Sequence, residues 1–204
     1  MVAMSHVSPS TSTAVSQAPS RCIFSTGETV TVNGAGYTLQ KLLGKGKGGY
    51  SYLARRDGQP VVVKQIHHEP CSYYQFGDKI AAEINDYRRL CTVGIAMPRM
   101  LEVDRQAERI VKEYIEGDTV FALVRAGALP PACLDAMRAI CQKLYAAGLN
   151  IDYFPTNFIP RAGTLYYVDY ECNAYMEQWD FEHWGIQYWS QTPAFLEYLR
   201  DHEN

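Results

Sequence analysis

Three oxygen-bearing side chains lie near one another in the last third of the chain. Asp152 and Asn157 stand five positions apart in NIDYFPTN, and Asp169 ends the apolar run LYYV. An acidic residue at the end of a buried strand is best explained by a bound cation, and Mg²⁺ prefers carboxylate and amide oxygens. The set offers metal ligands and one further carboxylate, which predicts chemistry on a nucleotide carried with Mg²⁺.

A glycine-rich stretch, LGKGKGGYSYLA, could approach a phosphate group closely. Gly44, Gly46 and Gly49 form G-x-G-x-x-G, and Gly48 adds flexibility. Because glycine has no side chain, backbone amides in such a loop can reach phosphate oxygens. Alone, the motif is equally typical of a hairpin turn. A dinucleotide-binding loop would lead directly into a helix, whereas a strand-like segment follows here, so we expect the loop to join two strands.

Lys64 and Glu83 form a candidate ion pair. Lys64 lies in VVVKQI, where alternation puts it on one face with Val62 and Ile66. Such a lysine is usually a surface residue whose ammonium reaches water. However, Glu83 falls within the apolar stripe of the helical segment KIAAEINDYRRLC, and a buried carboxylate requires a cationic partner. The pair would place an ammonium group beneath the glycine loop.

The elements that position these residues are strands first and helices later. Short β-branched and aromatic runs between the turns NGAG, GKGKGG and RDGQ predict strands up to Ile66. A helix is expected over residues 78–91, a hairpin over 100–115 and a long helix over 130–148. Thr192 is the expected N-cap of a last helix. This order predicts an α+β protein in two lobes that join near EYIEG.

Composition and charge exclude several classes of function. The chain has 204 residues, of which 47% are hydrophobic, and a formal net charge of -3 with the signs interspersed. This balance gives no general attraction to nucleic acid or to an anionic membrane. No apolar run approaches the roughly 20 residues that span a bilayer, and no secretory signal pattern is present. We therefore expect a cytoplasmic protein without a membrane span or a nucleic-acid partner.

The cysteines and the first residues carry little chemistry. Six scattered cysteines suit reduced core thiols better than a disulfide framework. They are Cys22, Cys71, Cys91, Cys133, Cys141 and Cys172. The string HHEPC is a weak metal candidate, because no second cluster completes it. Residues 1–21 are rich in Ser, Thr, Ala and Pro and are expected to form a disordered leader, with a targeting role as the less favoured alternative.

The whole series resembles the protein kinase-like superfamily over residues 37–171. LGKGKGGYSYLA is similar to the family's glycine loop, VVVK to its V-A-I-K lysine, and Glu83 follows that lysine by 19 residues. VKEYIEG resembles the hinge, DYFPTN resembles D-x-x-P-x-N, and VDYE stands where D-F-G would. The resemblance implies a two-lobed α+β fold. Its N-lobe, residues 22–115, would have an antiparallel sheet and one helix, and its shortened, mainly helical C-lobe would be residues 116–204.

The resemblance also implies an ATP site between the lobes. The residues implied for nucleotide binding are Leu43, Gly44, Gly46, Gly48, Gly49, Val62, Lys64, Glu113 and Ile115. The glycine amides would cover the phosphates, and the leucine and valine would pack on adenine. The backbone of Glu113 and Ile115 would hydrogen-bond the edge of the base.

The same resemblance implies catalytic roles for five residues. Lys64, held by Glu83, would bind the α- and β-phosphates, and Asp152 would accept the proton of the attacking hydroxyl. Asn157 and Asp169 would bind Mg²⁺. Catalysis would then rest on positioning and charge neutralisation.

Several residues depart from the family pattern. Asn150 and Ile151 replace the histidine and arginine of H-R-D, which argues against regulation by a phosphorylated activation loop. Phe154 stands where protein Ser/Thr kinases usually carry lysine. Glu171 replaces the glycine of D-F-G, as in choline kinase-like enzymes. Lys112 occupies the gatekeeper position, where a lysine has no evident role in the sequence.

The chain after Asp169 is too short for the helices on which protein kinases dock peptides. All three tryptophans lie there, and we expect Trp179, Trp184 and Trp189 to be core residues rather than the wall of a substrate pocket. The leading hypothesis is a minimal, atypical kinase that is Ser/Thr kinase-like, lipopolysaccharide kinase-like or choline kinase-like. It would transfer the γ-phosphoryl group of ATP to a hydroxyl on a protein or a small molecule. The alternatives are a pseudokinase that binds ATP or proteins without turnover, and an α+β interaction protein with an incidental glycine loop.

Overall fold

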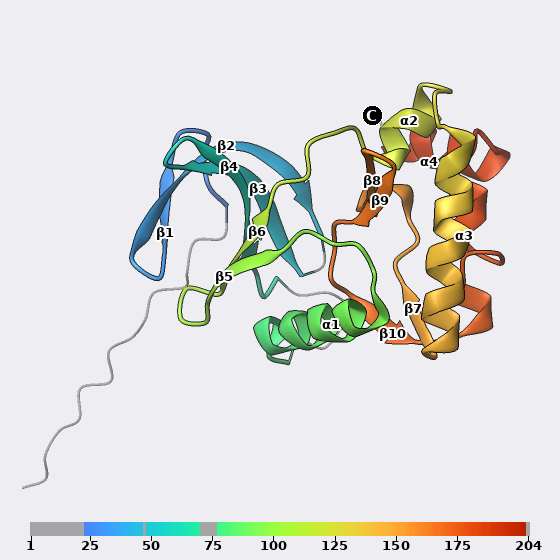
Figure 1. Cartoon of the computed structure of the whole chain (residues 1–204). Coiled ribbons are helices and arrows are strands. Elements are labelled where there is room, and N and C mark those ends of the chain that lie inside the picture. The colour runs from blue at the N-terminus through green and yellow to red at the C-terminus, as the bar shows by residue number, and fades with distance from the viewer. Residues whose placement is uncertain (1–22, 47, 70–76, 203–204) are drawn as a thin grey trace, which may run out of the picture.

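A computed structural model describes residues 23–46, 48–69 and 77–202. The expectations for the leader at residues 1–21, for Cys22 and for Cys71 of HHEPC lie outside these ranges. Within them, the protein is α+β, with a curled antiparallel sheet and four α-helices. The predicted fold class is therefore correct at this level. In Figure 1 the sheet and helix α1 lie on one side, and the other helices lie on the opposite side.

The sheet has six strands in the order β1-β2-β3-β4-β6-β5, with every neighbouring pair antiparallel. Its strands are β1 (Thr29–Val32), β2 (Ala35–Lys45), β3 (Gly49–Arg56), β4 (Gln59–Ile66), β5 (Met100–Asp104) and β6 (Arg109–Glu113). The glycine loop joins β2 to β3, as predicted. Asn33-Gly34 and Asp57-Gly58 make two-residue turns with positive φ at both positions, the geometry that suits the twist of a hairpin.

Helix α1 (Lys79–Val93) packs against the sheet and holds Glu83. The Asp78 carboxylate accepts a hydrogen bond from the amide of Ala81, and Gly94 ends the helix with a φ of 76°. The predicted helix at 78–91 is thus confirmed to within two residues. Ile80 and Ile84 meet Ile66 and Ile110 of the sheet in a small core of their own.

The remaining helices surround a second and larger core. They are α2 (Val120–Arg125), α3 (Pro131–Ala146) and α4 (Pro193–His202). Met137, Cys141 and Leu144 of α3 are buried there, as its periodicity predicts. The amide of Phe195 donates to the Thr192 hydroxyl at 3.2 Å, which confirms the predicted cap of α4.

Short strands and 3₁₀ helices lie between α3 and α4 in the chain. β7 (Leu149–Ile151) pairs with β10 (Cys172–Ala174), and β8 (Phe158–Arg161) pairs with β9 (Thr164–Tyr167). The 3₁₀ helices are η1 (Pro155–Asn157), η2 (Glu177–Trp179) and η3 (Gly185–Tyr188). The two ribbons place both functional strings, NIDYFPTN and VDYE, on the side of the helical part that faces the sheet (Figure 1).

The expectation that the cysteines are core residues is only partly met. Cys133, Cys141 and Cys172 are buried thiols, but Cys91 is exposed because the apolar stripe of α1 continues through Leu90 instead.

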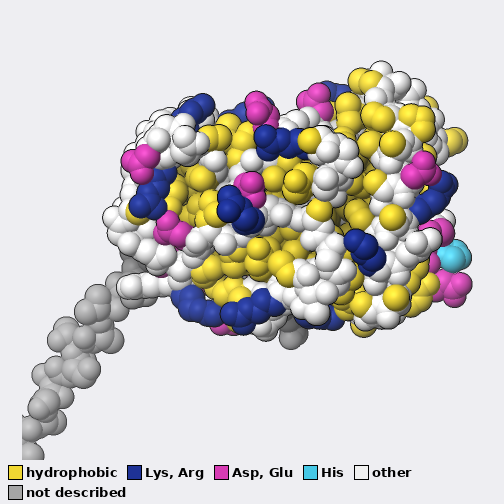
Figure 2. Space-filling view, in the orientation of Figure 1, with side chains coloured by type: hydrophobic (Ala, Val, Ile, Leu, Met, Phe, Trp, Pro, Cys, Tyr) yellow, Lys and Arg dark blue, Asp and Glu magenta, His cyan; other side chains and the backbone are white. Residues whose placement is uncertain are grey.

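Within the described ranges, no helix is both long and apolar enough to cross a membrane. On the face shown in Figure 2, acidic and basic side chains are interspersed between hydrophobic ones and do not gather into a patch of one sign.

Candidate functional site

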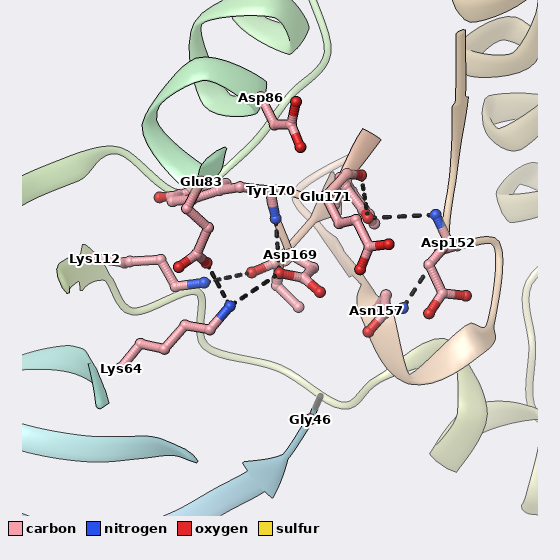
Figure 3. A network of polar contacts seen from close by, with 12 residues as sticks. Gly46, Lys64, Glu83, Asp86, Lys112, Asp152, Asn157, Asp169, Tyr170 and Glu171 are labelled. Carbon is pink, nitrogen blue, oxygen red and sulfur yellow. Dashed lines mark hydrogen bonds and ion pairs between the residues drawn. The ribbon is translucent and has the colours of Figure 1, made fainter. Parts of the chain in front are cut away.

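A cleft of about 1050 Å³ lies between the sheet with α1 and the helical part. Five of the predicted residues line it together: Lys64, Glu83, Asp152, Asn157 and Asp169. Gly46 and Gly48 line it from the glycine loop. Figure 3 shows that these side chains come from β4, α1, the loop after β7, and the segment after β9. Folding therefore brings together residues that lie more than a hundred positions apart in the chain.

The predicted ion pair between Lys64 and Glu83 is present. The ammonium of Lys64 donates to Oε1 of Glu83, and each side chain is 11% exposed. Lys64 Nζ also lies 3.5 Å from Oδ1 of Asp169. Burial alone would lower the pKa of Lys64, but the carboxylates of Asp169 and Glu83 outweigh it and raise the pKa above its ordinary value. Lys64 is therefore a permanent cation on the cleft surface.

Asp169 is held in place through its own backbone and through its neighbours. The amide of Tyr170 donates to Oδ1 of Asp169 at 2.8 Å, and the amide of Val168 donates to the carbonyl of Asn157 at 2.9 Å. Burial opposes ionisation of Asp169, but Lys64 and Lys112 lower its pKa below the ordinary value. The carboxylate is thus ionised and directed at Lys64.

The loop after β7 fixes Asp152 and Asn157 relative to each other. The amide of Phe154 donates to Oδ1 of Asp152 at 3.0 Å, and Nδ2 of Asn157 donates to the Asp152 carbonyl at 3.4 Å. The Asn157 amide oxygen is then the atom that can ligate a cation. Tyr167 braces the loop, because its hydroxyl accepts from the Asp152 amide and donates to the Glu171 carbonyl.

The glycine loop is anchored at its base. The amide of Gly46 donates to the Gly49 carbonyl at 2.9 Å, and the His67 ring contacts the Gly46 carbonyl at 3.0 Å. Gly48 lies beside Lys64, since a Cβ added there would be 3.7 Å from the ammonium nitrogen. Gly49 has a different role. Its added Cβ would lie 2.4 Å from the Gln65 carbonyl oxygen, so glycine is required for the close approach of β3 to β4.

The residues expected around adenine do not line this cleft. These residues are Leu43, Val62, Glu113 and Ile115. Gly44 and Gly49 of the glycine loop are also absent from the lining. Leu43 is 44% exposed and Ile115 is buried. The Glu113 amide already donates to the Arg99 carbonyl at 2.9 Å, so this amide is engaged within the protein. The described cleft thus contains the residues predicted to act on the phosphates and in catalysis, and not those predicted to contact the base.

An aromatic wall closes the opposite side of the cleft, and the sequence did not predict it. The aromatic wall consists of Phe154, Trp179, Trp184, Tyr188 and Tyr198. The Phe154 ring lies 4.7 Å from the Tyr198 ring and 5.1 Å from the Tyr188 ring, centroid to centroid. Trp179 is 51% exposed.

The expectation of three core tryptophans is therefore correct for Trp189, met in part by Trp184, which is half-buried against the core, and wrong for Trp179. Trp189 is buried, and its indole nitrogen donates to the Tyr153 carbonyl. Phe154 was the available signal for the aromatic wall, because an apolar ring two positions after Asp152 must pack against something nearby. Asp86 was also missed. It lines the cleft from α1 and accepts a hydrogen bond from the Cys172 amide on β10.

The side chains of the cleft fit a metal ion that takes most of its ligands from phosphate groups and water rather than from the protein. Among the described residues, no group of three or more His, Cys, Asp or Glu is placed to hold a metal ion. Asp169 and Asn157 supply one carboxylate and one amide oxygen. This small set suits Mg²⁺, which commonly binds one or two protein carboxylates together with phosphates and water.

The chemistry of the cleft must be argued from its geometry. No protein-family model and no curated protein sequence matches the chain. The cleft combines a permanent cation, a carboxylate fixed opposite it, and a second carboxylate beside an amide ligand on one loop. Such a set can bind a polyanion and accept a proton from a neutral nucleophile.

Proposed function

We propose that the protein is an ATP-dependent phosphotransferase with a two-lobed, kinase-like arrangement. The N-lobe would comprise residues 22–115 and the C-lobe residues 116–204, with the cleft between them as the active site. The observation that carries the proposal is the ion pair of Lys64 with Glu83, whose ammonium also faces Asp169 across the cleft. A fold without a polyanionic ligand has no need to direct a buried lysine at two carboxylates from separate elements.

In the proposed reaction the acceptor hydroxyl attacks the γ-phosphorus of ATP. A new oxygen–phosphorus bond forms, the bond from the γ-phosphorus to the bridging oxygen breaks, and ADP leaves with that oxygen. Asp152 takes the hydroxyl proton, while Lys64 binds the phosphates and Glu83 holds Lys64. Asn157 and Asp169 would hold Mg²⁺, which when bound neutralises phosphate charge.

The glycine loop and the strands behind it are the proposed nucleotide side. Gly48 lines the cleft and would present its backbone amide to phosphate oxygens, while Gly46, whose amide donates to the Gly49 carbonyl, would hold the turn of the loop. Leu43 and Val62 would contact the adenine ring, and the chain from Glu113 to Ile115 would bind its edge. These adenine contacts rest on the family resemblance, since the described cleft does not reach them.

The aromatic wall is the proposed acceptor side. It follows Asp152 directly, because Phe154 belongs to the same loop and packs on Tyr188 and Tyr198. Asp152 lines the same cleft as this wall and Lys64, so an acceptor bound on the wall would present its hydroxyl to the carboxylate. An acceptor with an apolar or ring-shaped portion suits such a surface better than a charged peptide does.

The proposal is tested first by binding and then by turnover. We expect saturating Mg·ATP to raise the melting temperature, because a ligand at a hundred times its Kd stabilises the folded state by about 2.7 kcal/mol. Asp169→Ala should abolish this shift. Asp135→Ala, an exposed acid of α3 outside the cleft, is the matched control and should retain it.

Turnover separates an enzyme from a pseudokinase. ATP hydrolysis and autophosphorylation are compared between the wild type and Asp152→Ala, whose loop geometry should still allow nucleotide binding. We expect the wild type to turn over and the variant to lose at least about a hundredfold in rate. An unshifted wild-type melting temperature would exclude the nucleotide site. A shift without turnover would support the pseudokinase alternative.

A further inference from the structure

Lys112 is a buried lysine that the proposed reaction does not use. It lies on β6 opposite Val62 of β4, on the sheet face that also carries Lys64. It is 4% exposed and does not line the cleft. A lysine in such a position is costly, because its charge has left water. The pKa of Lys112 is lowered by this burial and by the nearby charge of Lys64.

The ammonium of Lys112 makes two contacts, one on each side of Asp169. Nζ donates to the carbonyl oxygen of Val168 at 3.0 Å. It also lies 4.4 Å from the centroid of the Tyr170 ring, a favourable distance for a cation over an aromatic face. Figure 3 shows the Lys112 and Lys64 side chains approaching the Asp169 segment together.

Tyr170 is itself rigidly placed. Its hydroxyl donates to the carbonyl of Pro98 at 2.7 Å, and its ring packs on the ring of Tyr87 at 4.7 Å. The residue before Asp169 is therefore held through its carbonyl, and the residue after it is held by its ring and its hydroxyl. With both neighbours fixed, the Asp169 carboxylate has little freedom to turn away from Lys64.

Packing alone does not explain a lysine here. A leucine or methionine could fill a buried position between strands without the desolvation cost of a charge. What a lysine adds is a cation at the end of a long chain, which can bind a carbonyl oxygen in the neighbouring segment. Charge-assisted hydrogen bonds of this kind are among the stronger ones in proteins.

We propose that Lys112 is a positioning residue that fixes the backbone around Asp169, so that this carboxylate stays directed at the cleft and at Lys64 in the ligand-free protein. The consequence for metal binding rests on the proposed function. Asp169 would be set for Mg²⁺ before nucleotide arrives, and no separate activating event would be needed to turn it inward.

The first test measures the backbone directly and needs no nucleotide. Hydrogen–deuterium exchange is followed in the ligand-free wild type and in Lys112→Met. We expect faster exchange in peptides that cover residues 165–172, by about tenfold for the loss of one charge-assisted hydrogen bond, and unchanged exchange in α3. Lys143→Met is the matched control, because Lys143 also donates to a backbone carbonyl, that of Gly94, but is exposed.

The second test measures the Mg²⁺ requirement. The Mg²⁺ concentration that gives half of the ATP-induced melting shift should rise about tenfold in Lys112→Met and stay unchanged in Lys143→Met. A merely structural role would lower the melting temperature of the ligand-free protein without changing this concentration. Lys112→Arg, which keeps a cation, should restore the wild-type requirement at least in part.

Three results decide between the possibilities. Wild-type exchange at residues 165–172 in Lys112→Met would overturn the inference, whatever the nucleotide data show. If the wild type does not bind Mg·ATP, the proposed function fails, and the exchange measurement still decides the role of Lys112. If Lys112→Met does not fold, Lys112→Leu takes its place, because leucine is uncharged and has no hydrogen-bond donor. Wild-type exchange in that variant would overturn the inference equally.

Discussion

At the scale of single residues, the charges of the cleft are arranged as a balanced group. Lys64 and Lys112 face Glu83 and Asp169, with two cations opposite two carboxylates. Among the described residues, Oε2 of Glu83 is a buried oxygen without a hydrogen-bond partner. Three of these charges are buried and Asp169 is 31% exposed, which is tolerable only because each charge compensates another. The group is therefore a poor source of stability, and this cost is better explained by ligand binding.

A second charged pair has a structural role and predicts a pH dependence. Asp180 is buried between η2 and η3. Its carboxylate accepts hydrogen bonds from the amide of His183 at 2.8 Å and from the Tyr175 hydroxyl at 3.0 Å, and the His183 imidazole nitrogen lies 2.8 Å from it. Burial opposes its ionisation, but these partners lower the pKa of Asp180, and the same contact raises the pKa of His183.

The sign of the pH effect follows from these two directions. The Asp180 contribution to the free energy of unfolding is present above the usual Asp pKa of about 4 and is lost as pH falls below it. The His183 contribution is present below the usual His pKa of about 6.5 and is lost as pH rises through the raised value. The pair should thus stabilise most between these values.

This prediction is checked by measuring the midpoint of urea unfolding from about pH 3 to pH 9. That range of about six units includes both usual pKa values. In Asp180→Asn the unfolding midpoint should no longer increase as the pH rises from acidic values. Asp135→Asn, at an exposed site on α3, should follow the wild type. An identical profile for Asp180→Asn and the wild type would show that the pair does not contribute.

Residue pairs differ in how well the sequence predicts them. The pairing of Lys64 with Glu83 was predictable, because a carboxylate in an apolar helix stripe demands a cation and the preceding strand offers one. The partners of Lys112 were not, because Val168 lies 56 positions away and contributes a backbone carbonyl. Every residue has a backbone carbonyl, so the residue type at position 168 does not indicate that its carbonyl accepts this hydrogen bond.

At the scale of elements, two glycines of the glycine loop have different roles, which the sequence motif alone does not distinguish. Gly49 is needed so that β3 can approach β4, whereas Gly48 lies beside Lys64, where an added Cβ would make only an ordinary contact. Gly49→Ala should lower the free energy of unfolding by about 1–3 kcal/mol, because its Cβ would press on a backbone carbonyl. Gly48→Ala should change it by less than about 0.5 kcal/mol.

The two variants should behave differently towards nucleotide as well. Gly48→Ala is expected to weaken Mg·ATP binding roughly three- to tenfold, the loss expected for one amide–phosphate hydrogen bond. Chemical denaturation and calorimetric titration measure the two effects separately. A large loss of stability in Gly48→Ala would mean that this glycine, too, is needed for the close approach of β3 to β4.

Elements with strong local signals were predictable and the others were not. Helices α1, α3 and α4 have caps, prolines or glycines at their ends, and their bounds agree with expectation to within a few residues. The ribbons β7–β10 and β8–β9 were not recognised as pairs. Their strands are three or four residues long, so their pairing depends on tertiary contacts rather than on propensity.

At the scale of the whole molecule, the cleft has two sides with different origins. The glycine loop, β4 and α1 supply the cationic side, and the loop after β7 with η2, η3 and α4 supplies the aromatic wall. Helix α4 supports the wall through Tyr198, which contacts Phe154. The end of the chain is therefore part of the site, which the sequence could not indicate because the wall exists only after folding.

This division predicts that nucleotide binding and acceptor preference can be changed independently. Lys64→Met should abolish the Mg·ATP melting shift. Trp179→Ala should keep the shift, because Trp179 is half exposed and lies on the aromatic wall. If the wall binds the acceptor, benzyl alcohol should be phosphorylated faster than ethanol by the wild type, and Trp179→Ala should reduce that ratio.

Leu101→Ala is the matched control, since Leu101 is a similarly exposed apolar residue on β5 and does not line the cleft. It should leave both the melting shift and the ratio of the two rates unchanged. A loss of Mg·ATP binding in Trp179→Ala as large as that in Lys64→Met would contradict the division. The aromatic wall would then have to contact the nucleotide itself, because one exposed side chain cannot otherwise weaken binding as much as the phosphate-binding lysine does.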